Sequence, residues 1–172
     1  MPPRVVLVGL PGSGKSAVGA ALASRLEVAF ADSDELITQQ TGRSVSEIFS
    51  SQGEPAFRQL EADLIAEALV SFDGVLALGG GAVTTESVRQ DLLASGAPVV
   101  RLGAGHEELL HRMAGSGDRP LLAGDPAARL ADLAKARAGL YAQVASLSID
   151  TSGRSVAEVA ATLHRQLVGQ PS

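Results

Sequence analysis

The sequence predicts an α/β fold in which a five-stranded parallel sheet is covered by helices on both faces. First, short apolar runs alternate along the chain with longer stretches whose apolar residues recur at helical spacing. Second, some of the short runs, such as 75–78, are apolar throughout, which is typical of strands covered on both sides. Alternating strands and helices are joined by right-handed crossovers, and these produce a parallel sheet.

The apolar pattern sets the expected order of the elements. Strands are predicted at 4–8, 28–31, 75–78, 98–102 and 147–150, and helices at about 15–26, 34–42, 45–71, 85–95, 105–115, 126–146 and 155–168. In the first helix Val18, Leu22 and Leu26 lie on one face. Thr41-Gly42 predicts the end of the second helix, and the series Ser44-Val45-Ser46-Glu47 is a capping box that begins the third.

Length and composition limit the kind of protein. The chain has 172 residues, which suits a single domain with a substantial core. Its net charge is −5, and it has no basic stretch with interleaved aromatics, so we expect no nucleic-acid partner. The first apolar run is broken at Pro11 and Gly12, which excludes a signal peptide or membrane span there. There is no cysteine. We expect a cytoplasmic protein without a membrane partner, and a monomer.

A glycine-rich motif between the first strand and the first helix has the pattern of a P-loop. It reads Gly9-Leu10-Pro11-Gly12-Ser13-Gly14-Lys15-Ser16. In this pattern the backbone N–H groups from Gly12 to Ala17 surround phosphate oxygens, Lys15 reaches the outer phosphates and the Ser16 hydroxyl ligates Mg²⁺. The alternative is a glycine-rich turn that opens an ordinary helix. The strand before the motif and the helix after it favour binding of a nucleoside triphosphate with Mg²⁺.

Two aspartates follow the second predicted strand. A P-loop enzyme normally has an acidic residue at the end of a buried strand for Mg²⁺, but the strand 75–78 is followed by glycines. We therefore assign Asp32 to the Mg²⁺ shell. Asp34 is then available to accept the proton of an attacking hydroxyl. The alternative is that one of these aspartates, Asp34 above all, only caps the helix that starts near Glu35.

Gly79, Gly80 and Gly81 follow the third strand. They form either a plain strand-to-helix turn or a stretch of exposed backbone N–H groups that a substrate approaches closely. We favour the second interpretation.

Four arginines each allow a functional and an ordinary role. Arg58 forms either a surface i,i+3 ion pair with Glu61 or part of a binding site. Arg137 lies either on a solvated helix face or in the site. Arg112 lies on the helix that leads into a glycine-rich loop at about 114–124, and its planar guanidinium can stack on an adenine. Arg119, within that loop, is either a free loop charge or an arginine that closure of a lid brings to the transferring phosphoryl group.

Over nearly its whole length the chain resembles a shikimate kinase. The resemblance rests on the P-loop at 9–16, Asp32-Ser33-Asp34, Thr41-Gly42-Arg43-Ser44, Ile48-Phe49, Gly53-Glu54, Phe57-Arg58, the series Gly79-Gly80-Gly81-Ala82-Val83, Arg119-Pro120-Leu121-Leu122, and Arg137 before Leu140-Tyr141. It implies a P-loop NTPase fold of the nucleoside-monophosphate-kinase type with a mobile lid. It also implies phosphorylation of the 3-hydroxyl of shikimate by ATP, giving shikimate 3-phosphate and ADP on the way to chorismate and the aromatic amino acids.

The resemblance assigns roles to the site residues. Arg58 and Arg137 would bind the shikimate carboxylate, Asp34 its ring hydroxyls, and the backbone of Gly79, Gly80 and Gly81 would complete a substrate region within about 32–61 and this loop. Arg119 would be the lid arginine. On the adenine side the contacts would come from Arg112 and from Arg154 in the turn 151–156, which lacks the proline of some relatives. The alternatives are a gluconate kinase-like enzyme of the same fold and a P-loop module that binds ATP without catalysis.

Overall fold

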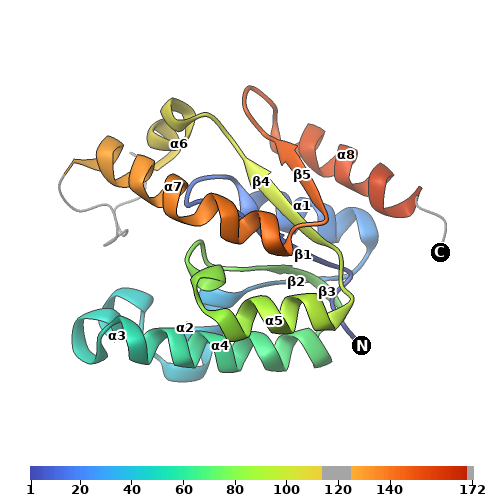
Figure 1. Ribbon diagram of the computed structural model, residues 1–172. Coiled ribbons are helices and arrows are strands. Elements are labelled where there is room, and N and C mark those ends of the chain that lie inside the picture. Colours follow the sequence, from blue (N-terminus) through green and yellow to red (C-terminus); the bar gives the residue numbers. More distant parts are fainter. Residues whose placement is uncertain (114–124, 170–172) are drawn as a thin grey trace.

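The five strands form one sheet, and every strand lies within one residue of its predicted bounds. The computed structural model describes residues 1–113 and 125–169 (Figure 1). The strand order is β2-β3-β1-β4-β5, and all neighbouring pairs are parallel. The strands are β1 (Val5–Val8), β2 (Ala29–Asp32), β3 (Gly74–Ala77), β4 (Val99–Gly103) and β5 (Leu147–Asp150). The predicted α/β fold with a five-stranded parallel sheet is confirmed.

Helices connect the strands and cover the sheet. They are α1 (Lys15–Leu26), α2 (Ser33–Thr41), α3 (Val45–Gln52), α4 (Glu54–Ser71), the 3₁₀ helix η1 (Ala82–Thr84), α5 (Glu86–Ser95), α6 (His106–Met113), α7 (Pro126–Val144) and α8 (Val156–Val168). In the described ranges, 1–113 and 125–169, no helix combines the length and apolar character needed to cross a membrane.

The predicted helix at 45–71 is wrong as a single element, because Gly53 divides it into α3 and α4. Gly53 has φ 83° and ψ 168°, a conformation that glycine adopts without the steric penalty of a Cβ. Pro55 follows in the first turn of α4, where its missing N–H costs no helical hydrogen bond. The apolar spacing runs through both helices and conceals the break, whereas Gly53 followed closely by Pro55 is a local signal for it.

Two helix caps that the sequence indicated are present, one at Gly42 and one at Ser44. Gly42 ends α2 with φ 69°, and its N–H donates to the Thr38 carbonyl at 2.9 Å. Ser44 caps α3, since its Oγ accepts from the Glu47 N–H at 3.1 Å. These caps set where α2 ends and α3 begins, and therefore how the chain returns toward α4.

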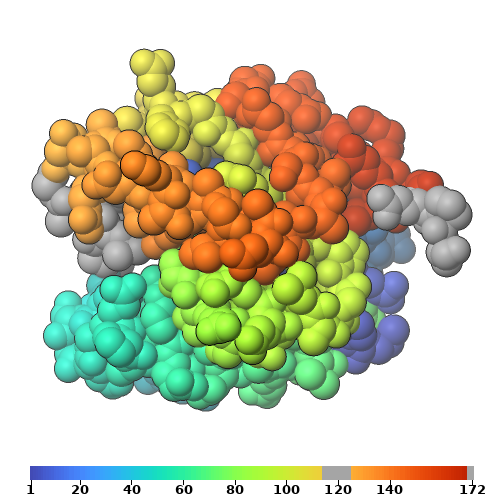
Figure 2. All heavy atoms as spheres, in the orientation of Figure 1, coloured from blue at the N-terminus to red at the C-terminus, as the bar shows by residue number. Residues whose placement is uncertain are grey.

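Alternate residues of each strand supply two cores. Val5 and Leu7 of β1 point to the face covered by α1 and α8, where they pack with Leu22 and Leu163. Val6 and Val8 point to the opposite face, which the helices from α4 to α7 cover. Seen as spheres, α5 and α7 meet over this second face (Figure 2). Both faces of the sheet are thus buried, and polar groups collect beyond the carboxyl ends of the strands.

Candidate active site

The loop from β1 to α1 has the conformation that its glycines predict. Gly9, Gly12 and Gly14 have φ of 152°, 80° and 96°, values that side chains rarely allow. A Cβ at Gly9 would collide with the Leu102 carbonyl oxygen of β4 and would lie 2.8 Å from Ser13 Oγ. Only glycine therefore fits there, and the loop leads directly into the N-terminus of α1, where backbone N–H groups favour an anion.

Lys15, the first residue of α1, lies over this loop. Its ammonium group donates to the Gly9 carbonyl at 2.7 Å and to the Leu10 carbonyl at 3.0 Å. The charge is therefore held beside the loop that the motif assigns to phosphates, where an ammonium group would compensate the charge of outer phosphate oxygens.

Ser16 and Asp32 meet across the gap between α1 and the end of β2. The Ser16 hydroxyl donates to Asp32 Oδ2 at 2.7 Å, and Asp32 Oδ1 accepts from the Asp34 N–H at 2.9 Å. Asp32, and not Asp34, is therefore the cap of α2. A hydroxyl and a carboxylate beside a phosphate loop fit Mg²⁺, which usually keeps waters and phosphate oxygens as its other ligands. No group of three or more acidic or histidine side chains suited to a metal occurs in residues 1–113 and 125–169.

Asp34 and Glu61 both lie against the backbone of Gly79. A Cβ added at Gly79 would lie 2.8 Å from Asp34 Oδ1 and 3.2 Å from Glu61 Oε2. The absence of a side chain at Gly79 therefore makes room for two carboxylates from α2 and α4. The Gly79 N–H donates to Ser33 Oγ at 2.8 Å, so it is used within the protein. Our expectation that the triple glycine leaves its N–H groups exposed is wrong for Gly79.

Arg58 forms the ion pair that its spacing suggested, but in a buried setting. Its Nη1 donates to Glu61 Oε1 at 2.8 Å, and the two side chains are 11% and 1% exposed. The interpretation as a surface pair is therefore wrong. A Cβ at Gly81 would collide with the Arg58 guanidinium, so the glycine loop also makes room for this cation. Burial raises the pKa of Glu61 to about 7, although the positive charges of Arg58 and Arg137 oppose this rise.

Arg137 of α7 is buried and not on a solvated helix face. The residue is 4% exposed, and its Nη1 has no hydrogen-bond partner. That nitrogen would lie 3.4 Å from a Cβ at Gly80, next to the Arg58 guanidinium at Gly81. A buried guanidinium N–H without an acceptor is costly, because water has been removed and nothing has replaced it. The consecutive glycines 80 and 81 therefore lie against two guanidinium groups, and Nη1 of Arg137 has no acceptor there.

Tyr141 holds the glycine loop against α7, a role that sequence reasoning missed. Its hydroxyl donates to the Gly80 carbonyl at 2.6 Å, and its ring is buried. Burial raises the pKa of Tyr141 above its ordinary value, so the phenol keeps its proton and remains a donor. Arg101 of β4 lies over the ring, with Cζ 5.3 Å from the centroid. No local pattern could have shown this contact, since 61 residues separate donor and acceptor.

Tyr141→Phe should destabilise the protein by about 1–3 kcal/mol, because the Gly80 carbonyl loses its buried donor. Urea unfolding followed by circular dichroism measures this difference. Thr84→Val is the matched control, since the Thr84 hydroxyl also donates at 2.6 Å, to the Gly81 carbonyl, but Thr84 is exposed. Equal losses in the two variants would mean that burial of the Tyr141 bond has no special effect.

Arg112 of α6 links three segments. Its Nη1 donates to the Gly12 carbonyl of the P-loop at 3.1 Å, and its Nη2 donates to Glu108 at 2.5 Å and to the Thr151 carbonyl at 3.3 Å. Arg112 is thus fixed between the phosphate loop and the turn after β5. Arg154 in the same turn donates to Thr162 of α8 at 2.6 Å, so its guanidinium is held against that helix.

The predicted lid at 114–124, with Arg119, lies outside the described residues.

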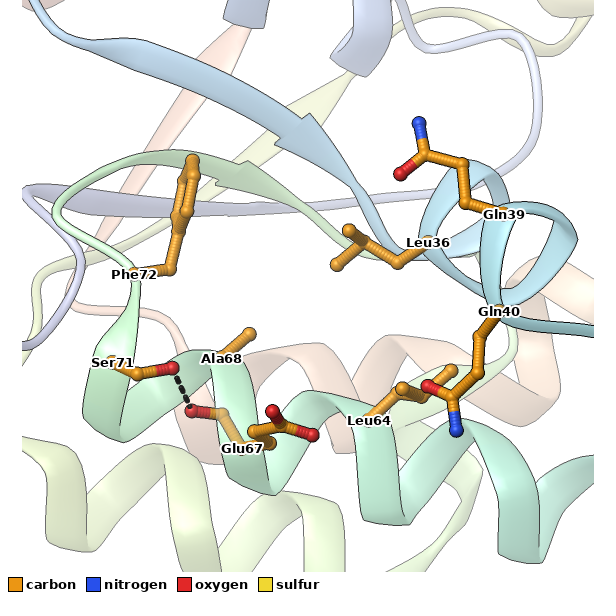
Figure 3. A pocket seen from close by; sticks show the side chains of 8 residues that line it. All are labelled: Leu36, Gln39, Gln40, Leu64, Glu67, Ala68, Ser71 and Phe72. Carbon is orange, nitrogen blue, oxygen red and sulfur yellow. Dashed lines mark hydrogen bonds between the residues drawn. The ribbon is translucent and has the colours of Figure 1, made fainter.

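A cavity of about 360 Å³ lies between α2 and α4 and is separate from the site (Figure 3). It is lined by Leu36, Gln39, Gln40, Leu64, Glu67, Ala68, Ser71 and Phe72. None of these is a predicted site residue, so the cavity has no part in the arrangement described above.

Comparison with known proteins decides the family. The family model for shikimate kinase matches residues 11–168. The chain belongs to the shikimate kinase family. It is 49% identical over 164 residues to the shikimate kinase of Corynebacterium glutamicum, covering 94% of this chain and 95% of that one. It is 47% identical over 174 residues to that of Mycobacterium tuberculosis H37Ra, covering 100% and 98%.

The fold of this shikimate kinase agrees with a solved structure of the family. A shikimate kinase from Acinetobacter baumannii in complex with shikimate superposes with a TM-score of 0.92 at 35% identity, over 98% of this chain and 94% of that one. The P-loop kinase fold of the nucleoside-monophosphate-kinase type is therefore confirmed. The activity is that of an ATP-dependent shikimate kinase in aromatic amino-acid biosynthesis, which decides against a gluconate kinase-like enzyme or a module without catalysis.

Proposed function

We propose that the enzyme binds shikimate in the space enclosed by Arg58, Arg137, Asp34 and the loop 79–81, and transfers to its 3-hydroxyl the γ-phosphoryl group of ATP bound at the P-loop. The observation that carries this assignment is the buried Arg137 Nη1, which lacks an acceptor beside the Arg58 guanidinium. A substrate carboxylate would supply that acceptor, and charge-assisted bonds to two guanidinium groups would orient it.

The opposite charges of the site match the two ends of this acceptor. The carboxylate of shikimate would lie at the arginines from α4 and α7, while its hydroxyl groups would face Asp34 at the start of α2. Asp34 is exposed, so an incoming hydroxyl can reach it. The backbone at Gly80 and Gly81 would line the space between these two ends.

The transfer step uses the groups around the P-loop. Asp34 would accept the proton as the 3-hydroxyl oxygen bonds to the γ-phosphorus, and the bond from that phosphorus to the bridging oxygen breaks, leaving ADP. Lys15 would compensate charge on the outer phosphates. Ser16 and Asp32 would hold Mg²⁺, which when bound neutralises charge on the phosphates.

Several parts of the assignment remain predictions. Arg112 would stack on the adenine, with Arg154 contributing on the same side, and Arg119 would reach the phosphoryl group from a closing lid. The phosphate contacts from Gly12 to Ala17, a monomeric state and a cytoplasmic location are likewise proposed.

Arg58→Ala and Arg137→Ala should each weaken shikimate binding by about 2–3 kcal/mol, because each removes a desolvated charged partner of the carboxylate. ATP affinity should change little. Isothermal titration with shikimate and with ATP measures both constants. Arg129→Ala, an exposed arginine two turns before Arg137 on α7, is the matched control and should bind shikimate like the unmodified enzyme.

A shikimate analogue with a neutral amide in place of the carboxylate makes this test specific. The amide should bind the unmodified enzyme weakly, but the two arginine variants should lose little further affinity for it. Additive losses from analogue and variant would show that these arginines do not contact the carboxylate. ADP release with shikimate, gluconate, AMP, CMP or no acceptor tests the choice of substrate directly.

A further inference from the structure

Glu61 is a buried carboxyl group whose two oxygens have different environments. Oε1 accepts from Arg58 at 2.8 Å, whereas Oε2 is buried, has no hydrogen-bond partner and lies at Gly79, beside Asp34 Oδ1. An ionised carboxylate in this position has one unsatisfied oxygen and a second carboxylate close to it. A protonated carboxyl would turn that oxygen into a hydrogen-bond donor and remove the like-charge repulsion.

The charged groups acting on Glu61 come from three helices. They are Arg58 from its own helix, Asp34 from α2 and Arg137 from α7. The other elements packed on α4 contribute apolar side chains, namely Ile48 of α3, Val83 of η1, and Val88 and Leu92 of α5. Asp34 and Glu54, whose carboxylate lies 3.4 Å from the Arg58 guanidinium, are exposed to solvent, so Glu61 is the buried carboxyl group of this cluster.

We propose that binding of a substrate carboxylate at Arg58 and Arg137 shifts Glu61 toward its protonated form, with the proton taken up from solvent. This inference rests on the acceptor site proposed above. The incoming carboxylate adds a negative charge next to buried Glu61 and engages the guanidinium group that stabilises its ionised form. Protonation of Glu61 offsets the added charge and releases the Arg58 Nη1–H group from the ion pair, so that it can bind the substrate.

Proton uptake by Glu61 makes the affinity for shikimate depend on pH in a defined direction. In the free enzyme the pKa of Glu61 is about 7, and it is higher in the complex because the substrate charge disfavours a second anion. Binding is therefore strongest below about pH 7, where Glu61 is already protonated, and weakens as the pH rises above it. A rise of one pKa unit in the complex corresponds to about tenfold weaker binding at high pH than at low pH.

Titration calorimetry of shikimate without nucleotide tests the proposal. At pH 7.5 the binding enthalpy is measured in two buffers of matched ionic strength, PIPES and Tris, whose ionisation enthalpies differ. A rise of the pKa by one unit predicts uptake of about half a proton by the unmodified enzyme. Glu61→Gln, which keeps an oxygen for Arg58, should bind shikimate with no uptake and with a constant affinity from pH 6.5 to 8.5. Glu67→Gln, an exposed glutamate on the same helix, should retain the uptake.

The outcomes separate this proposal from the acceptor site itself. Shikimate binding without proton uptake at pH 7–8, or equal uptake by Glu61→Gln, would overturn the linkage and leave the site standing. No saturable binding of shikimate would overturn both. If circular dichroism shows that Glu61→Gln is unfolded, the neutral amide analogue decides with the unmodified enzyme. It should bind without proton uptake, and uptake equal to that with shikimate would contradict the proposal.

Discussion

Lys15→Ala is expected to lower kcat by about 10³-fold or more while the fold persists, because the ammonium group compensates charge on the outer phosphates and on the transferring phosphoryl group. The ammonium group donates to the carbonyls of Gly9 and Leu10. The core contacts of α1 are made by other residues, among them Val18 and Leu22, so the substitution leaves them unchanged.

Steady-state release of ADP at saturating ATP and shikimate measures this effect, and circular dichroism checks the fold. Lys135→Ala is the matched control, since Lys135 is the other lysine of the chain and is exposed on α7. Its kcat should equal that of the unmodified enzyme. A folded Lys15→Ala variant that keeps more than about a tenth of kcat would contradict the catalytic role.

Asp34→Asn is expected to lower kcat by about 10²–10⁴-fold with ATP affinity nearly unchanged, because the amide keeps the size of the side chain but cannot accept a proton. Asp32→Asn should act differently. It keeps an oxygen for the Asp34 N–H cap but removes the charge next to the Ser16 hydroxyl, so more Mg²⁺ should be needed for half-maximal activity.

Titration of Mg²⁺ against ADP release in both variants separates the two roles. Glu35→Gln, an exposed carboxyl group next to Asp34, is the control and should change neither kcat nor the Mg²⁺ requirement. If the Asp32 and Asp34 variants respond identically to Mg²⁺, the assignment of Asp32 as a metal ligand and Asp34 as the proton acceptor is wrong.

Much of the fold and the phosphate side of the site could be predicted because their signals are local. A strand shows its apolar run, a cap shows its serine or glycine, and the P-loop brings all its groups together within eight consecutive residues. The contact of Ser16 with Asp32 also follows from topology, since β2 ends at the same edge of the sheet as the P-loop. The break at Gly53 was missed because the apolar spacing continues across it.

The parallel α/β architecture and the nucleotide loop are therefore predictable from local patterns in the sequence, whereas the residues for an acidic, hydroxylated acceptor were suggested by the resemblance to shikimate kinases. Whether a charged side chain is buried depends on contacts between segments that are distant in the sequence, and burial changes its pKa and its need for a hydrogen-bond partner. The i,i+3 spacing of Arg58 and Glu61 suggests a surface ion pair. In the fold the pair is buried, because the loop at Gly79 and Gly81 packs against both side chains. The burial that leaves Arg137 Nη1 without an acceptor and raises the pKa of Glu61 is produced by segments far apart in the chain, so no local pattern predicts it.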